Sequence, residues 1–282
     1  MEIKNILICG AGTMGNGIAH VFALNGFNVS VLELNSEISK KALNTISLNL
    51  DRQIKKNIIN QEQKTSTLNN LSFITNFDEV QNDIDLVIEA IYENYEAKKL
   101  LFQQLDKKIN KDSIFASNTS AISITNLSKN IRPDRFLGMH FMNPVPVMKL
   151  VEIVRGYSTS DLTFNTIFNL AKRIDKIPVS VNDYPGFISN RILLPMINEA
   201  IYAFYENVAS VEDIDTVMKL GMNHPMGPLQ LADFIGLDVC LDIMNVLYEG
   251  FSDSKYRPCP LLKKMVAAGK LGRKSGEGFY KY

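Results

Sequence analysis

A glycine-rich turn near the start of the chain restricts the fold more than any other segment. Residues 3–9 are mostly apolar and predict a buried strand. The turn G-A-G-T-M-G follows at positions 10–15, and apolar residues then recur at helical spacing as far as Gly26. A second strand is expected at residues 28–32, directly before Glu33. Strand, glycine turn, helix, strand and acid in this order are the full context of a dinucleotide-binding unit.

The glycines of this turn have separate physical roles. The first permits a tight turn, the second lets the backbone approach a pyrophosphate, and the third lets the helix pack closely on the strand. The pyrophosphate is then expected at the N-terminal end of the helix, where free N–H groups and the helix dipole favour an anion. The residues expected to bind the cofactor here are Gly10, Gly12, Thr13, Met14 and Gly15.

Glu33 indicates which dinucleotide is bound. It follows the turn at about the 20-residue distance at which an acid accepts hydrogen bonds from the adenosine ribose. A carboxylate at this place repels a 2′-phosphate, so NAD is expected rather than NADP. The alternative is a glycine-rich turn that serves packing only.

The remainder of the chain divides into two parts. Strand and helix patterns alternate as far as a last strand at residues 177–181, which predicts an α/β, Rossmann-type, mostly parallel sheet domain at residues 1–184. The character changes at Asn182-Asp183-Tyr184-Pro185-Gly186. Beyond it the pattern predicts an all-helical C-terminal domain at residues 185–282, with a long helix at 187–207 that Pro195 should kink.

His140 and Glu152 form a second constellation. The segments 136–140 and 150–154 read as two short strands joined by a proline-stiffened loop. Glu152 is the single carboxylate in an apolar run, and such a charge is costly to bury unless it is paired. If the strands lie side by side, Glu152 orients His140 and raises its basicity, which makes a proton-transfer catalyst. The alternatives are a structural histidine at a strand end and a carboxylate at an exposed edge.

Polar and basic residues mark two further candidate binding regions. Asn118-Thr119-Ser120 follows an expected parallel strand, where small polar side chains point into a ligand crevice or cap the next helix. Ser36 is expected to cap a long polar helix that runs to about Ile59 and carries Arg52, Lys55 and Lys56. This basic face is either solvated or a docking site for a phosphorylated ligand.

Composition excludes several other classes of protein. Lys plus Arg and Asp plus Glu each number 30, which argues against binding to nucleic acid or a membrane surface through bulk charge. No apolar run is long enough to span a bilayer, and no secretory signal is visible. The three cysteines have neither pairing nor metal-ligand spacing, so reduced thiols in a cytoplasmic protein without a metal site are expected.

Taken together, these motifs resemble those of the short-chain L-3-hydroxyacyl-CoA dehydrogenases, most of all the bacterial 3-hydroxybutyryl-CoA dehydrogenases. The resemblance covers essentially the whole chain. The motifs that carry it are G-A-G-T-M-G at 10–15, A-S-N-T-S at 116–120, H-F-M-N-P-V-P-V-M at 140–148, P-G-F-I-S-N-R at 185–191, H-P-M-G-P at 224–228 and G-E-G-F-Y at 276–280. Met142 replaces a Phe that is common in the family's histidine motif, which changes packing and not chemistry.

The resemblance implies roles for particular residues. His140 matches the catalytic base and Glu152 its orienting partner, while Ser120 and Asn190 match residues that bind the reacting end of the substrate. The positions that match cofactor contacts are Glu93, Lys98, Asn143 and Lys274. The positions that match coenzyme A contacts are Lys56 and Asn49, and some relatives have Ser in place of Asn49.

The expected activity follows from this resemblance. It is the NAD(H)-dependent interconversion of (S)-3-hydroxyacyl-CoA and 3-oxoacyl-CoA, in particular 3-hydroxybutyryl-CoA and acetoacetyl-CoA, as in fatty acid and butyrate metabolism. The helical domain is expected to contribute to a substrate cleft and to form a homodimer. Two alternatives remain: a dehydrogenase of a free hydroxy acid or sugar acid with the same two-domain plan, and a non-catalytic nucleotide-binding structural or regulatory protein.

Overall fold

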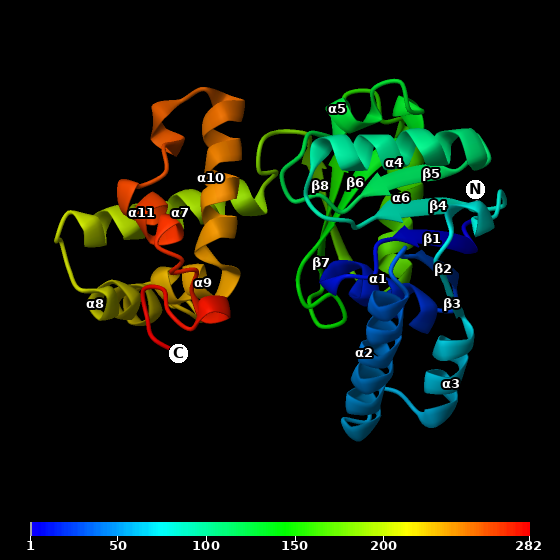
Figure 1. Cartoon of the computed structure of the whole chain (residues 1–282), viewed down its shortest axis with the longest axis horizontal. Helices are drawn as coiled ribbons and strands as arrows, with labels where there is room; N and C mark the ends of the chain where they lie inside the picture. Colours follow the sequence, from blue (N-terminus) through cyan, green and yellow to red (C-terminus); the bar gives the residue numbers. More distant parts are fainter. Residues whose placement is uncertain (1) are drawn as a thin grey trace. The chain divides into compact units, whose positions relative to one another are not determined.

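The computed structural model describes residues 2–282, and the chain forms two compact units. The first unit ends at Asp183, and the second comprises Tyr184–Tyr282. Figure 1 shows a sheet with helices in the first unit and helices in the second. This is the expected fold class, an α/β sheet domain followed by a helical domain.

One eight-stranded sheet forms the centre of the first unit. Its strands are β1 (Asn5–Cys9), β2 (Asn28–Leu32), β3 (Leu71–Ile74), β4 (Leu86–Glu89), β5 (Ile114–Ser117), β6 (Phe136–Phe141), β7 (Leu150–Arg155) and β8 (Ile177–Asn182). They lie in the order β3-β2-β1-β4-β5-β6-β7-β8. Neighbouring strands are parallel except β6 and β7, which are antiparallel. The mostly parallel sheet predicted from the sequence is therefore confirmed.

Apolar side chains cover both faces of this sheet, because successive residues of a strand point to opposite sides. On one face Ile8 belongs to a buried cluster with Phe22 of α1 (Thr13–Leu24) and Ile167 of α6 (Asp161–Arg173). On the other face Phe102 of α4 (Tyr95–Lys108) stacks on Phe115, with ring centroids 5.6 Å apart. Figure 1 shows α4 and α6 on either side of the strands.

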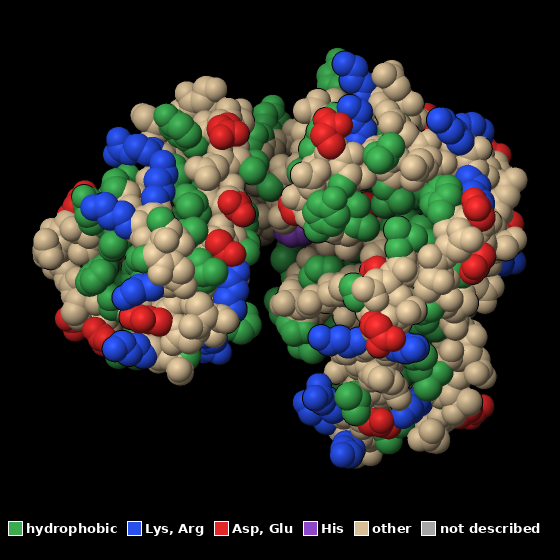
Figure 2. Space-filling view, in the orientation of Figure 1, with side chains coloured by type: hydrophobic (Ala, Val, Ile, Leu, Met, Phe, Trp, Pro, Cys, Tyr) green, Lys and Arg blue, Asp and Glu red, His purple; other side chains and the backbone are tan. Residues whose placement is uncertain are grey.

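The helix α2 (Ser36–Lys55) differs from its prediction at both ends. Asn35, and not Ser36, is the N-cap, and its side chain accepts from the backbone N–H groups of the first turn. The helix ends at Lys55, earlier than the expected Ile59, and the separate helix α3 (Gln61–Asn69) follows. Asn60 and Gln63 cap α3 reciprocally. Lys and Arg side chains gather over the lower end of α2 (Figure 2), where Arg52 and Lys55 form the last turn.

The second unit packs its helices around a core of its own. They are α7 (Ser189–Tyr205), α8 (Val211–Thr216), α9 (Pro228–Ile235), α10 (Leu237–Phe251) and α11 (Pro260–Ala267). Leu194, Leu229 and Met244 are among the residues buried in this core. The long helix continues through Pro195, and the side chain of Ser210 caps α8 by accepting from the N–H of Asp213. Within Tyr184–Tyr282 the structure has isolated bridges but no strand.

Two buried aspartates fix the C-terminal tail. Asp233 accepts from the backbone N–H groups of Phe279 and Tyr280, at 2.9 and 2.8 Å. Asp215 accepts from the hydroxyl of Tyr280 at 2.8 Å and from the start of α9. These contacts order a segment that has little secondary structure. Across residues 2–282, no helix combines the length and the apolar character needed to cross a membrane.

Candidate active site

The glycine turn between β1 and α1 has the geometry that its sequence predicts. Gly10 has φ +97°, which favours glycine, and a Cβ there would lie 2.7 Å from the carbonyl oxygen of Ala90. A Cβ on Gly15 would lie 1.9 Å from the carbonyl oxygen of Gly10. A Cβ on Gly12 would meet nothing within 4 Å, and Gly12 caps α1 without a side-chain hydrogen bond. The first N–H groups of α1 thus face an open approach, which suits a pyrophosphate.

Glu33 lies beside this turn, at the carboxyl end of β2. Its carboxylate accepts from the N–H of Ala11 at 3.1 Å and from the N–H of Asn35 at 3.2 Å. A cavity of about 810 Å³ extends from Gly10 and Glu33 to Tyr92 and the start of α4. An adenosine has room here, with its ribose at Glu33 and its phosphates at the glycine turn. The residues present therefore fit a dinucleotide.

The antiparallel pairing of β6 and β7 brings His140 opposite Glu152. The Nδ1 atom of His140 lies 2.7 Å from a carboxylate oxygen of Glu152. Both residues are buried, at 8% and 1% exposure. The predicted pairing is therefore present, and the buried carboxylate has a partner that stabilises its charge. The contact at Nδ1 fixes the orientation of the imidazole ring.

Ser120 takes part in a hydrogen-bond network around Glu93. The Glu93 carboxylate accepts from the backbone N–H of Ser120 at 3.0 Å, from its hydroxyl at 3.3 Å, and from the hydroxyl of Thr119. Lys98 lies 3.1 Å from the same carboxylate. Burial opposes the charge on Glu93, but Lys98 and these donors outweigh it and hold the pKa of Glu93 below its usual value. Three predicted site residues are thus in contact at the carboxyl ends of β4 and β5.

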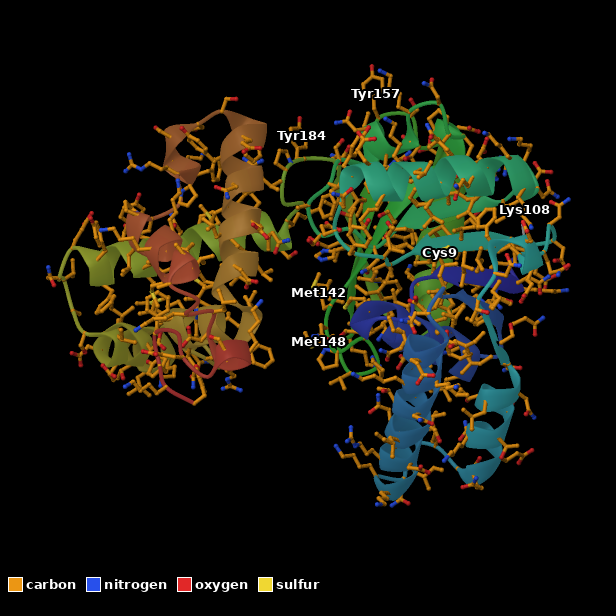
Figure 3. The ribbon with its side chains drawn as sticks, in the orientation of Figure 1. Cys9, Lys108, Met142, Met148, Tyr157 and Tyr184 are labelled. Carbon is orange, nitrogen blue, oxygen red and sulfur yellow. The ribbon has the colours of Figure 1, made fainter. Side chains whose placement is uncertain are left out.

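Asn143 lies in the loop that joins β6 and β7. Figure 3 shows this loop alongside α1, with Met142 and Met148 labelled at its two ends. The loop packs closely on the helix, because a Cβ on Gly17 would lie 2.9 Å from the Cβ of Val145. A second cavity of about 470 Å³ is bounded by this loop, by the glycine turn and by α2, whose Asn49 lines it.

The other predicted binding residues lie in separate surroundings. In the first unit, Lys56 is exposed at the C-cap of α2, and the side-chain oxygen of Asn49 accepts from Arg52 at 3.0 Å. In the second unit, Asn190 is buried in the first turn of α7. Lys274 forms an ion pair with Asp238 of α10, at 2.5 Å.

Asn118, which belongs to the polar segment expected at the crevice, and two residues that the sequence did not single out support this site. Glu89 lies at the end of β4 and contacts Lys98 at 2.5 Å. The side-chain oxygen of Asn118 accepts from the backbone N–H of Phe141 at 3.0 Å, beside the histidine. Lys176 donates to two carbonyls of the β6–β7 loop, at 2.5 and 2.7 Å. Of the two missed residues, Glu89 had a recognisable signal, because it is an acid in an apolar strand, as Glu152 is.

Comparisons with known proteins show the family of this chain. Residues 5–184 match the family description "3-hydroxyacyl-CoA dehydrogenase, NAD binding domain", and residues 186–282 match "3-hydroxyacyl-CoA dehydrogenase, C-terminal domain". The chain is 54% identical over 283 residues to a probable 3-hydroxybutyryl-CoA dehydrogenase of Bacillus subtilis, covering 100% of this chain and 98% of that protein. It is 52% identical over 281 residues to the 3-hydroxybutyryl-CoA dehydrogenase of Bradyrhizobium diazoefficiens, covering 99% and 96%.

A solved structure shows the same similarity. The (S)-3-hydroxybutyryl-CoA dehydrogenase of Ralstonia eutropha matches with a TM-score of 0.96 and 49% identity, covering 100% of this chain and 99% of that one. The fold and the glycine turn define an NAD-binding oxidoreductase. The chain belongs to the 3-hydroxyacyl-CoA dehydrogenase family, so the resemblance read from the motifs is confirmed and NAD is the cofactor.

Proposed function

We propose that the protein interconverts (S)-3-hydroxybutyryl-CoA and acetoacetyl-CoA with NAD(H), and that His140 is its general acid and base. The observation that carries this proposal is the buried 2.7 Å contact between His140 and Glu152 in the NAD-binding unit. The names of the relatives at 52–54% identity support the choice of substrate.

The pair meets the proton requirement of this reaction. Bound NAD supplies the acceptor for the hydride that leaves C3 of the hydroxyacyl group. The Nε2 atom of neutral His140 takes the proton of the 3-hydroxyl group, and the resulting imidazolium donates a hydrogen bond from Nδ1 to the Glu152 carboxylate. In the reverse direction the imidazolium returns a proton to the oxygen at C3. The Glu152 carboxylate stabilises the cationic form of the histidine in both directions.

The other predicted residues bind and orient the ligands. Ser120 and Asn190 hydrogen-bond the substrate oxygens and fix the approach geometry. Lys56, exposed near the end of α2, attracts the phosphates of coenzyme A, with Asn49 two turns earlier. Around NAD, the contacts beyond the glycine turn and Glu33 come from Glu93, Lys98, Asn143 and Lys274.

An NADH oxidation assay tests this function. The purified protein is expected to oxidise NADH with acetoacetyl-CoA. The variant His140→Ala should lower kcat by at least about 100-fold, the range ascribed to a positioned general acid, while it still binds NADH. A folded, NADH-binding protein without turnover would refute the activity. Turnover of His140→Ala close to the wild-type value would refute the role of the histidine.

Free acetoacetate separates this function from the alternative of a free hydroxy acid. We expect acetoacetyl-CoA to be preferred, and we expect Lys56→Met to raise its KM while the weak turnover of free acetoacetate is unchanged. Equal kcat/KM values for the free acid and the thioester would favour the alternative. The third reading, a non-catalytic nucleotide-binding protein, predicts no turnover of either compound.

The second unit is also proposed to form a homodimer in the cytoplasm. Large apolar side chains are exposed on it, among them Ile192 at 67%, Leu220 at 83% and Met222 at 61%. Such side chains would lose contact with water in an interface with a second copy of the chain. Analytical ultracentrifugation should give twice the chain mass of 31.7 kDa, and a purely monomeric protein at assay concentrations would contradict this proposal.

A further inference from the structure

A buried ion pair contacts Glu93, one of the predicted site residues that follow β4 and β5. Glu89 is the last residue of β4, and Lys98 belongs to the first turns of α4. Their charged atoms are 2.5 Å apart, and their side chains are 0% and 1% exposed. Burying two charges is costly and is stabilising only with good geometry and further hydrogen bonds. Such a pair therefore needs an explanation beyond stability.

The Lys98 ammonium has a partner for each of its three N–H groups. These partners are Glu89, the carboxylate of Glu93 at 3.1 Å, and the carbonyl oxygen of Ile91 at 3.4 Å. With its amine directed at these three groups, Lys98 influences the placement of Ser120 through Glu93. The Glu93 carboxylate in turn accepts from both the N–H and the hydroxyl of Ser120.

Glu89 is held from three sides. Besides Lys98, its carboxylate accepts from the N–H of Ile91 at 2.8 Å and from the hydroxyl of Ser117 at 2.6 Å. The hydroxyl of Ser117 also accepts from the N–H of Thr119 at 3.2 Å. The carboxylate therefore joins the ends of β4 and β5 to the start of α4. Burial raises the pKa of Glu89, although Lys98 and these donors act against it.

We propose that Glu89 is a positioning residue for this active site: its carboxylate fixes the ammonium of Lys98, which fixes Glu93 and through it Ser120. This inference rests on the proposed function, because the placement of Ser120 matters only to an enzyme that binds substrate there. Glu89 touches neither substrate nor cofactor in this account. Through Lys98 it restricts the Glu93 carboxylate to one of the several rotamers that this side chain could adopt.

The variant Glu89→Gln removes the charge and keeps the shape. The Gln carbonyl can still accept from Ile91 and Lys98, and Ser117 can accept from the new amide group. Lys98 then has Glu93 as its remaining acidic partner. Without the Glu89 charge to fix the ammonium, the distance between Lys98 and Glu93 can change. We expect kcat with acetoacetyl-CoA to fall at least about tenfold while its KM changes less than about threefold, because Ser120 acts on the reacting end.

A double-mutant cycle separates positioning from general damage. If Glu89 acts through Glu93, Glu89→Gln should lower kcat at least about tenfold in the wild-type background and less than about threefold in the Glu93→Gln background. A merely structural role predicts the same factor in both backgrounds and would overturn the proposal. Glu2→Gln is the matched control, because it is the same substitution at an exposed ion pair with Lys4. Glu2 precedes β1, whereas the glycine turn follows this strand.

A second variant keeps the test valid if Glu89→Gln does not fold. Glu89→Gln with Lys98→Met removes both buried charges and leaves neither unpaired. We expect this variant to fold, with a kcat within about threefold of that of Glu93→Gln, and a kcat near the wild-type value would overturn the proposal. Wild-type protein in the same assay keeps the two proposals apart: its failure to turn over refutes the function, whereas equal turnover of Glu89→Gln refutes this inference alone.

Discussion

The variant Glu152→Gln tests the proposed proton transfer most directly. Glu152 is 1% exposed, and its carboxylate lies 2.7 Å from Nδ1 of His140. Glutamine has nearly the same shape and can still accept the Nδ1 hydrogen through its amide oxygen. The substitution therefore keeps the orientation of the ring and removes the negative charge beside it.

The size of the effect follows from the geometry of the pair. Two unit charges about 4 Å apart interact by about 4 kcal/mol at an effective dielectric constant of about 20. The amide dipole recovers part of this, so the cationic form of His140 loses about 2 to 3 kcal/mol of stabilisation. Because His140 gains this charge when it takes the proton of the 3-hydroxyl group, kcat for the oxidation of (S)-3-hydroxybutyryl-CoA should fall about 100-fold.

Steady-state kinetics and a binding titration measure this together. We expect kcat for NAD and (S)-3-hydroxybutyryl-CoA to fall by that factor, while the Kd of NADH, followed by its fluorescence, changes less than about threefold. Glu2→Gln again controls for the loss of one carboxylate. If kcat of a folded Glu152→Gln protein stays within about threefold of wild type, the carboxylate does not support the histidine as proposed.

Further predictions concern the cofactor site and the dependence of stability on pH. Glu33→Ala should weaken NADH binding about 10-fold or more and NADPH binding less, and an unchanged preference in fluorescence titrations would count against the ribose contact. Gly12→Ala should leave unfolding unchanged and weaken NADH binding, whereas Gly15→Ala, whose Cβ would lie 1.9 Å from the Gly10 carbonyl, should destabilise by about 1 to 3 kcal/mol in chemical denaturation. Burial lowers the pKa of His20 from 6.5 to about 4, so the unfolded chain takes up this proton first. As the pH falls from 6.5 to 4, His20→Leu should therefore lose about 3 kcal/mol less stability than wild type, and parallel urea-denaturation profiles would refute this.

The parts of the site that lie close in sequence were predictable. The glycine turn and Glu33 fall within one βαβ unit, so spacing alone indicates their relative positions. His140 and Glu152 are separated by one loop, and an unpaired acid in an apolar strand calls for a nearby partner. Glu89 is also an acid in an apolar strand, but its partners could not be predicted from the sequence. Lys98 lies on a helix, and Ser117 lies 28 residues further along the chain, on another strand.

Local signals also explain the errors in the helices. The helix α3 has one buried side chain, Thr67, and almost no apolar periodicity, so its hydrophobic pattern does not indicate a helix. Its capping box at Asn60 and Gln63 is the signal that would have revealed it. At the start of α2, Asn35 and Ser36 are both good N-caps, and sequence alone does not rank two adjacent candidates.

β6 and β7 form the one antiparallel pair of the sheet because residues 142–149, which join them, are too few for the crossover that parallel strands need. His140 pairs with Glu152 across these strands, and a slip of one residue would turn one side chain to the opposite face and separate them. Lys176 restrains the connecting loop through the carbonyls of Val145 and Met148, and the Gly17 contact presses that loop onto α1. The loop that sets the register therefore also places Asn143 beside the glycine turn. We infer that the β6–β7 loop determines both the alignment of His140 with Glu152 and the position of Asn143 at the cofactor site.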